Sequence, residues 1–156
     1  MSPRAERVLR LLVERGQTLA VAESLTGGLL AATLVEVPGA SAAFRGGLIP
    51  YATDLKASLV GVAPDLLAAR GPVDPDVAAA LAVGARERCV ADWGLATTGV
   101  AGPDPQAGRA VGTVYVAAAG PGLARTRSLA LAGDRAAIRT ATVDAVLDLL
   151  LELVSG

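Results

Sequence analysis

Two residues of this chain could together perform nucleophilic chemistry, the hydroxyl of Ser24 and the amine of Lys56. Thirteen of the 14 basic residues are arginine, and Lys56 is the only lysine. A lysine amine can lose its proton and act as a base, whereas a guanidinium does not. Ser-Lys pairs are an established alternative to Ser-His pairs in acyl transfer. The alternative interpretations are a solvated surface lysine, or an ion pair with an acidic neighbour such as Asp54 or Glu23.

The lack of histidine excludes several catalytic mechanisms and metal sites. The chain has no histidine and a single cysteine, Cys89. Ser-His-Asp triads, Cys-His dyads, His-zinc sites and His-dependent phosphotransfer are therefore excluded. No intramolecular disulfide and no thiolate cluster can form.

Ser24 stands in a segment that joins a predicted buried strand to a predicted helix. A helix N-terminus offers free backbone N–H groups and the positive end of the helix dipole. Gly27 and Gly28 would let a ligand approach the backbone closely, so this turn could bind a phosphate or stabilise an oxyanion. Thr26 adds a second hydroxyl. The competing interpretation is a plain helix cap by Ser24 or Thr26.

Lys56 is predicted to lie near the first turn of a short helix that follows Tyr51. Partial burial and a nearby helix N-terminus both disfavour the ammonium, so we expect a lowered pKa for this amine. A neutral amine could then take the proton of the Ser24 hydroxyl. Tyr51 could pass the proton on or orient the substrate, and otherwise packs against its neighbours.

Two further segments could bind a ligand. The Gly- and Pro-rich segment from Thr98 to Ala110 is predicted to be a loop after a strand, where open α/β sheets bind ligands. Within it, Gly99 and Gly102 suit a tight turn around a phosphate or ribose. Arg135 and Arg139 lie one turn apart at the start of the last predicted helix, where they could clamp a phosphate or simply be solvated.

The elements that must position these residues alternate between helices and strands. We predict helices over residues 3–15, 26–35, 55–60, 64–69, 75–89 and 134–154, and strands over 18–22, 47–51, 93–97, 111–118 and 125–131. Such alternation predicts an α/β layered domain with about five strands. The late hairpin through Gly120–Gly122 predicts a mixed sheet.

Composition limits the class of protein. A chain of 156 residues with 53% hydrophobic and 19% charged residues suits a single domain over residues 1–156. The net charge of −1 gives no broad footprint for nucleic acid or an anionic membrane, although Arg86/Arg88 and Arg125/Arg127 leave a small local patch possible. No apolar stretch has the length of a membrane helix and no signal peptide is visible. We therefore expect a cytoplasmic protein without nucleic-acid or membrane partners.

Several ordered motifs resemble the CinA C-terminal domain family, which includes the PncC-type nicotinamide-nucleotide amidohydrolases. The resemblance extends roughly from Val8 to Leu151. Its motifs are Ala22–Gly28, Pro38–Ser41, Phe44–Gly47, Tyr51 with Lys56, Leu59–Val62, Gly71–Val73, Thr98–Pro103, Gly112–Val114 and Gly133–Arg135 with Arg139. Several motifs in order are far more specific than any one, so they favour the functional interpretation of Ser24 and Lys56.

This resemblance implies a three-layer α/β/α sandwich and a homo-oligomer that uses neither metal nor cofactor. It implies hydrolysis of the carboxamide of nicotinamide mononucleotide to nicotinate mononucleotide and ammonia, in pyridine nucleotide salvage. Ser24 would be the nucleophile and Lys56 the base and then the acid, with Tyr51 assisting. Two-domain relatives carry a preceding nucleotide-pyrophosphatase domain, whose activity we expect to be absent.

The reaction also needs an oxyanion site and donors for the substrate phosphate. The turn of Thr26, Gly27 and Gly28 could supply backbone N–H groups. The loop carrying Thr98, Gly99 and Gly102, together with Arg135 and Arg139, supplies the candidates for the phosphate. Which of these sites holds the amide and which the phosphate stays open.

The chain departs from the family pattern in four places. Leu25 replaces a common cysteine, Thr53 replaces a common asparagine, Gly71–Asp74 replaces Gly-Ala-Val-Ser, and Pro105–Gly108 replaces a Gly-rich stretch. We expect these changes to affect affinity and turnover rather than the type of reaction. The alternative function is a nucleotide-binding or regulatory module without turnover, linked to competence or DNA damage, which would bind ligand without releasing ammonia.

Overall fold

A computed structural model describes all residues from Met1 to Gly156. Its elements in chain order are α1 (Pro3–Arg15), β1 (Leu19–Glu23), α2 (Leu29–Val35), a 3₁₀ turn η1 (Ala40–Ala42), β2 (Phe44–Leu48), α3 (Thr53–Ser58), α4 (Pro64–Arg70), α5 (Pro75–Arg88), β3 (Trp93–Gly99), β4 (Thr113–Gly120), β5 (Leu123–Ala130) and α6 (Arg135–Ser155). None of the helices combines the length and the apolar character required to cross a membrane.

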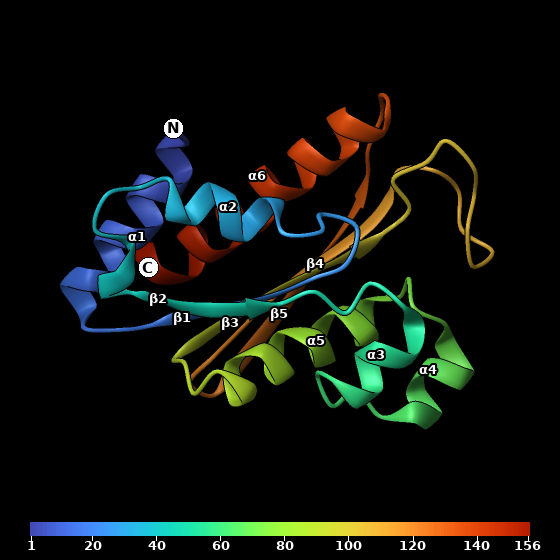
Figure 1. Ribbon diagram of the computed structural model, residues 1–156, viewed down its shortest axis with the longest axis horizontal. Helices are drawn as coiled ribbons and strands as arrows, with labels where there is room; N and C mark the ends of the chain where they lie inside the picture. The colour runs from blue at the N-terminus through green and yellow to red at the C-terminus, as the bar shows by residue number, and fades with distance from the viewer.

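The five strands form one mixed sheet in the order β2-β1-β3-β4-β5. Strand β1 pairs in parallel with both β2 and β3, whereas β4 is antiparallel to both β3 and β5. Helices α1, α2 and α6 cover one face of the sheet, and α3, α4 and α5 lie on the other (Figure 1). The predicted α/β/α sandwich with a mixed five-stranded sheet is confirmed.

The two faces of the sheet carry side chains of different size. Because successive residues of a strand point to opposite faces, Leu19 and Val21 of β1 join the core under α1, α2 and α6. Ala20 and Ala22 join the core under α5. Small side chains on this second face let α5 approach the sheet closely.

Three parallel strands deliver the candidate residues to one edge of the sheet. Strand β1 ends at Glu23, directly before Ser24, and β3 ends at Gly99. Strand β2 ends at Leu48 and leads through Tyr51 into α3, which carries Lys56. Because the carboxyl ends of parallel strands meet at one edge, segments far apart in the sequence converge there.

Helix boundaries confirm most of the predicted start and stop signals. The Ser2 side chain caps α1, which ends at Gly16 in the left-handed conformation. The Asp74 and Asp134 carboxylates cap α5 and α6. Helix α3 differs, because it begins at Thr53 after a non-capping Ala52, so Asp54 lies in the first turn rather than at the cap.

Several predicted boundaries are wrong by two or three residues. Strands β4 (Thr113–Gly120) and β5 (Leu123–Ala130) both extend closer to the hairpin turn than the predicted 111–118 and 125–131. Strand β2 spans Phe44–Leu48 rather than 47–51, because it pairs only with β1 and the chain leaves the sheet before Pro50, which has no N–H to donate. Helix α2 begins at Leu29 rather than Thr26. Thr98 and Gly99 belong to β3 rather than to a loop, because they pair with Tyr115 and Val114.

The close approach of α5 to the sheet yields a stability prediction. A Cβ on the buried Gly94 of β3 would collide with the Ala82 carbonyl oxygen and would lie 2.9 Å from the Arg86 nitrogen, both in the backbone of α5. We expect Gly94→Ala to lower the free energy of unfolding by about 1–3 kcal/mol, as overpacking does. Urea unfolding followed by Trp93 fluorescence measures this change.

Gly156→Ala is the control, because its Cβ would lie 3.7 Å from the nearest atom. An unfolding midpoint for Gly94→Ala equal to that of wild type would contradict the close packing of α5 on β3.

Candidate active site

Ser24 lies directly after the fully buried strand β1 and is itself 7% exposed. Its backbone N–H donates to the Thr97 carbonyl oxygen at 3.0 Å. The Thr97 hydroxyl also accepts from this N–H at 3.3 Å and contacts the Thr26 hydroxyl at 2.8 Å. The neighbouring strand β3 therefore fixes the position of Ser24. Thr97 was not among the predicted site residues, and its place beside Thr98 at a strand end was the available signal.

The side chain of Lys56 is buried at 1% exposure and points to Ser24. Its Nζ lies 3.0 Å from Ser24 Oγ, 2.8 Å from the Pro50 carbonyl oxygen and 3.2 Å from the Tyr51 carbonyl oxygen. No carboxylate lies within ion-pair distance of the amine. The surface and ion-pair interpretations of Lys56 are therefore wrong.

The three partners of Lys56 decide what a neutral amine would do there. Carbonyl oxygens of Pro50 and Tyr51 can only accept hydrogen bonds, and they match the two N–H groups of a neutral amine. The Ser24 hydroxyl is the one partner that can donate. A neutral Lys56 therefore directs its lone pair at the Ser24 proton, which is the arrangement that general-base catalysis requires.

Burial lowers the pKa of Lys56 to about 8. This confirms the predicted direction of the shift. Desolvation of the ammonium is the cause, since no opposite charge compensates it and α3 is only six residues long. A pKa near 8 leaves roughly a tenth of the amine neutral at pH 7.

Glu23, the residue before Ser24, caps helix α2. Its fully buried carboxylate accepts hydrogen bonds from the N–H groups of Leu30 at 2.8 Å and Ala31 at 3.0 Å. The N-cap position is Gly28, which has no side chain to contribute. The interpretation of Ser24 or Thr26 as helix caps is therefore wrong, and their hydroxyls are left for other contacts. A carboxylate at the end of a buried strand was the signal for this role.

Three N–H groups of the turn after Ser24 are unpaired. Gly27 N–H donates to the Ser24 carbonyl oxygen at 3.0 Å, so it is occupied. The N–H groups of Leu25, Thr26 and Gly28 donate to no group of the protein. An N–H of the residue after a nucleophile is a common oxyanion donor. Of the predicted Thr26–Gly28 set, Gly27 is therefore occupied, and Leu25 adds a donor that the prediction did not include.

A cavity of about 410 Å³ opens beside Ser24 and Lys56. Six predicted site residues line it: Ser24, Tyr51, Lys56, Thr98, Gly99 and Arg135. Five do not: Thr26, Gly27, Gly28, Gly102 and Arg139. The remaining wall is made of Leu25, Ala52, Thr53, Pro72, Val73, Ala101, Gln106 and Ala107. Thr53 and Gln106 therefore add polar groups to this wall.

The Tyr51 phenol faces Arg135 across the cavity mouth. Its hydroxyl accepts a hydrogen bond from Arg135 Nη2 at 3.2 Å, and 57% of the residue is exposed. Arg135 Nη1 donates to the Gly102 carbonyl oxygen. No hydrogen bond joins the phenol to Ser24 or Lys56, so Tyr51 reaches this pair only through its backbone carbonyl.

The two arginines of α6 are placed differently, although they are one turn apart. Arg135 lines the cavity and keeps three of its five N–H groups uncommitted. Arg139 lies outside the lining and donates to the carbonyl oxygens of Leu25 at 2.9 Å and Thr26 at 2.8 Å. They therefore do not form one clamp.

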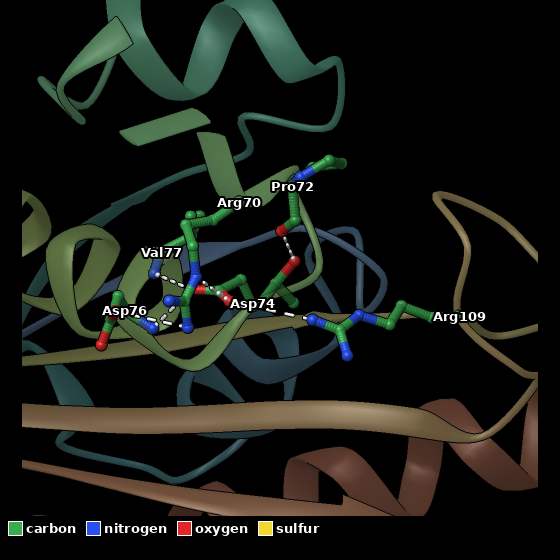
Figure 2. A network of polar contacts seen from close by, with 7 residues as sticks. Arg70, Pro72, Asp74, Asp76, Val77 and Arg109 are labelled. Carbon is green, nitrogen blue, oxygen red and sulfur yellow. Dashed lines mark hydrogen bonds and ion pairs between the residues drawn. The ribbon is translucent and has the colours of Figure 1, made fainter. Parts of the chain in front are cut away.

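A buried carboxylate holds the wall of the cavity that is formed by Pro72, Val73, Gln106 and Ala107. Figure 2 shows Asp74 at the start of α5, where it accepts from the N–H groups of Asp76 and Val77. Its Oδ1 also lies 2.9 Å from Arg70 Nε and 3.8 Å from Arg109 Nη2. Arg109 belongs to the segment between β3 and β4 that contributes Gln106 and Ala107 to the cavity, so this ion pair ties that wall to α5.

A second contact fixes the same wall from the sheet. Thr98 Oγ1 donates to the Pro72 carbonyl oxygen at 2.6 Å. Pro72 and the adjacent Val73 line the cavity. The hydroxyl of Thr98 is therefore committed to the wall. No group of three or more His, Cys, Asp or Glu side chains is placed to hold a metal ion.

Comparison with known sequences gives one family. The family described as the CinA C-terminal domain matches residues 1–154. The chain is 58% identical over 149 residues to a CinA-like protein of Frankia casuarinae, with 96% of this chain and 34% of that protein covered. A CinA-like protein of Gloeobacter violaceus is 48% identical over 143 residues, covering 90% of this chain and 34% of its own length. The chain thus spans about a third of the length of these curated relatives.

Solved structures agree with this match. The fold is similar to that of a competence-damaged protein (CinA) superfamily protein from Escherichia coli, with a TM-score of 0.93 and 30% identity, covering 96% of this chain and 88% of that one. The competence/damage inducible protein CihA from Agrobacterium tumefaciens gives a TM-score of 0.89 and 32% identity, covering 98% and 97%.

The buried amine predicts a pH-dependent difference in stability. The pKa of Lys56 is about 8 in the folded chain and near 10.5 in the unfolded one, so between these values the unfolded chain binds more protons. Wild type therefore gains stability as pH rises from 8 to 10.5, whereas Lys56→Met does not titrate. We expect the free energy of unfolding of Lys56→Met, relative to wild type, to fall by about 2 kcal/mol between pH 7 and pH 10.

Urea unfolding at the two pH values measures this difference. Ser58→Ala, on the same helix, is the control and should keep a constant difference from wild type. A difference for Lys56→Met that also stays constant would mean that the amine is not desolvated.

Proposed function

The chain belongs to the CinA C-terminal domain family, and on this premise we propose that it is an amidohydrolase with a Ser-Lys pair. The proposed substrate is nicotinamide mononucleotide, which would be hydrolysed to nicotinate mononucleotide and ammonia. The observation that carries the proposal is the 3.0 Å contact between Lys56 Nζ and Ser24 Oγ, with the other partners of the amine restricted to hydrogen-bond acceptors.

The acylation step uses the neutral amine. Lys56 Nζ takes the proton of the Ser24 hydroxyl as Oγ bonds to the carboxamide carbon, and the carbonyl oxygen becomes an oxyanion. Of the unpaired N–H groups of this turn, those of Leu25 and Thr26 directly follow Ser24 in the chain, and we assign the oxyanion to them. Lys56, now an ammonium, gives its proton to the departing nitrogen, so the C–N bond breaks and ammonia leaves with an acyl-serine remaining.

The deacylation step repeats the same proton transfers with water. Lys56 takes a proton from the water that attacks the acyl carbon, and then returns it to Ser24 Oγ as the ester bond breaks. The nicotinate product leaves and the pair regains its starting state. One amine therefore acts as base and acid in both halves, which suits a pKa close to neutral pH.

The cavity supports a substrate that carries a phosphate. A volume of about 410 Å³ is within the range of small-molecule sites. Arg135 stands at its wall with uncommitted N–H groups, and its contacts with the Tyr51 hydroxyl and Gly102 hold the guanidinium in place. We assign the phosphate to Arg135 and a substrate-orienting role to Tyr51. Homo-oligomerisation, which the family resemblance implies, stays a prediction.

The direct test is ammonia release from nicotinamide mononucleotide, nicotinamide and NAD by the purified chain. We expect release from the mononucleotide, and a loss of at least about a thousandfold in kcat for Ser24→Ala, Lys56→Ala and Lys56→Arg. Lys56→Arg is the sharpest variant, because arginine keeps the charge but does not act as a base. Ser58→Ala is the matched serine control and should retain activity.

Two outcomes would contradict the proposal. Full activity of Lys56→Arg would show that Lys56 is not the general base. Tight binding of the mononucleotide without ammonia release would instead favour the nucleotide-binding or regulatory module.

The pH dependence of kcat/KM gives a separate prediction. Since the reactive form of Lys56 is the neutral amine, kcat/KM should rise with pH through an apparent pKa of about 8 and then level off. Steady-state rates between pH 6 and pH 10 test this. A profile that is flat across this range, or that falls through pH 8, would show that no such amine acts as base.

A further inference from the structure

Arg139 contacts the backbone of the nucleophile turn, which we define as residues 24–28. The guanidinium comes from α6, more than a hundred positions along the chain, and donates from Nε to the Leu25 carbonyl oxygen at 2.9 Å. Its Nη2 donates to the Thr26 carbonyl oxygen at 2.8 Å. A Cβ on Gly27 would lie 3.7 Å from the same Nη2, so the guanidinium lies close to the turn. Leu25 lines the cavity, whereas Thr26, Gly27 and Arg139 do not.

Three successive carbonyls of the nucleophile turn accept hydrogen bonds. The Ser24 carbonyl oxygen accepts from Gly27 N–H at 3.0 Å. The Leu25 carbonyl accepts from Arg139 alone, and the Thr26 carbonyl accepts from Arg139 and from Leu29 N–H at 2.9 Å. In a trans peptide the N–H points opposite to the C=O, so holding a carbonyl also fixes the direction of the N–H in the same peptide group. The held Ser24 carbonyl therefore fixes the direction of the Leu25 N–H, and the held Leu25 carbonyl fixes that of the Thr26 N–H. Both N–H groups remain free to donate to a ligand.

The charge on Arg139 adds to this orientation. Hydrogen bonds from an ionised donor are roughly twice as strong as neutral ones. A cation on the Leu25 carbonyl polarises the peptide group that ends in the Thr26 N–H, which makes that N–H a stronger donor. A fixed and polarised donor stabilises an oxyanion without reorganising during the reaction.

Resting on the proposed amidohydrolase function, we propose that Arg139 is a positioning residue for the nucleophile turn. Its contact with the Leu25 carbonyl holds the peptide group that carries the Thr26 N–H. Its contact with the Thr26 carbonyl holds the peptide group of Gly27 N–H, which in turn holds the Ser24 carbonyl and so the Leu25 N–H. The N–H groups of Leu25 and Thr26 then receive the oxyanion, and Arg139 does not bind the substrate phosphate. Arg135, one turn earlier, provides the contrast because its guanidinium lines the cavity. The two arginines therefore act on different kinetic parameters.

The kinetic test compares Arg139→Met with Arg135→Met. For Arg139→Met we expect kcat to fall by about 10- to 1,000-fold with KM within about threefold of wild type, because an oxyanion donor is misdirected. The loss should be the same for nicotinamide mononucleotide and for its phosphate-free nucleoside. For Arg135→Met we expect KM to rise at least about tenfold for the mononucleotide and much less for the nucleoside.

A conservative variant separates positioning from loss of folding. Arg139→Lys keeps the charge in α6, but its single ammonium does not reproduce the planar two-point contact with Leu25 and Thr26. We expect it to keep the wild-type unfolding midpoint and still to lose most of the kcat. A selective rise in KM for the mononucleotide in either Arg139 variant would assign Arg139 to the phosphate and overturn the proposal. An unchanged kcat would overturn it as well.

A second readout does not depend on the amide substrate. A fluorophosphonate bonds its phosphorus to Ser24 Oγ as fluoride leaves and the serine proton passes to Lys56, and its P–O group occupies the oxyanion position. We expect Arg139→Met and Arg139→Lys to slow this labelling at least tenfold, and the control Ser58→Ala to leave its rate within threefold. Labelling without ammonia release in wild type would reject the proposed substrate alone. Equal labelling rates in all variants would reject the role of Arg139.

Discussion

The site depends on the burial of one amine among neutral acceptors. Lys56 is the only lysine of the chain, and its Nζ has no carboxylate partner. Its contacts are two backbone carbonyls and the Ser24 hydroxyl. An ion pair would have raised the pKa and held the proton, whereas desolvation releases it. In the folded chain the buried ammonium is destabilised, so the pKa of Lys56 falls. A lowered pKa is the condition under which an amine can act as a base near neutral pH.

The sheet supplies the rigidity that such a contact needs. Strand β1 is buried along its whole length, and the N–H of Ser24 is held by Thr97 of the adjacent parallel strand. Glu23 fixes the start of α2 through Leu30 and Ala31, so no hydroxyl of the turn is required as a cap. Charged and polar groups around Ser24 are therefore divided between supporting the backbone and facing the cavity.

The cavity walls come from segments whose contacts involve residues distant in the sequence. The carboxylate of Asp74 links the start of α5 to Arg109, and Thr98 links β3 to Pro72. The Arg109 contact depends on the charge of Asp74. This ion pair holds the segment that contains Pro105–Gly108 against α5, and that segment contributes Gln106 and Ala107 to the same wall.

The sequence by itself determined the layered fold, the mixed sheet and the choice of Ser24 and Lys56 as candidate site residues. These follow from local rules: the alternation of periodic segments, caps such as Ser2 and Asp74, and the choice of a lone lysine in an arginine-rich chain. Only the tertiary structure decided that Arg135 and Arg139 have separate surroundings, that the Tyr51 phenol faces Arg135, and that Glu23 caps α2. The physical reason is that a side chain's partner is set by which strands and helices meet in space, and residues a single turn apart on one helix can face a cavity or a neighbouring backbone.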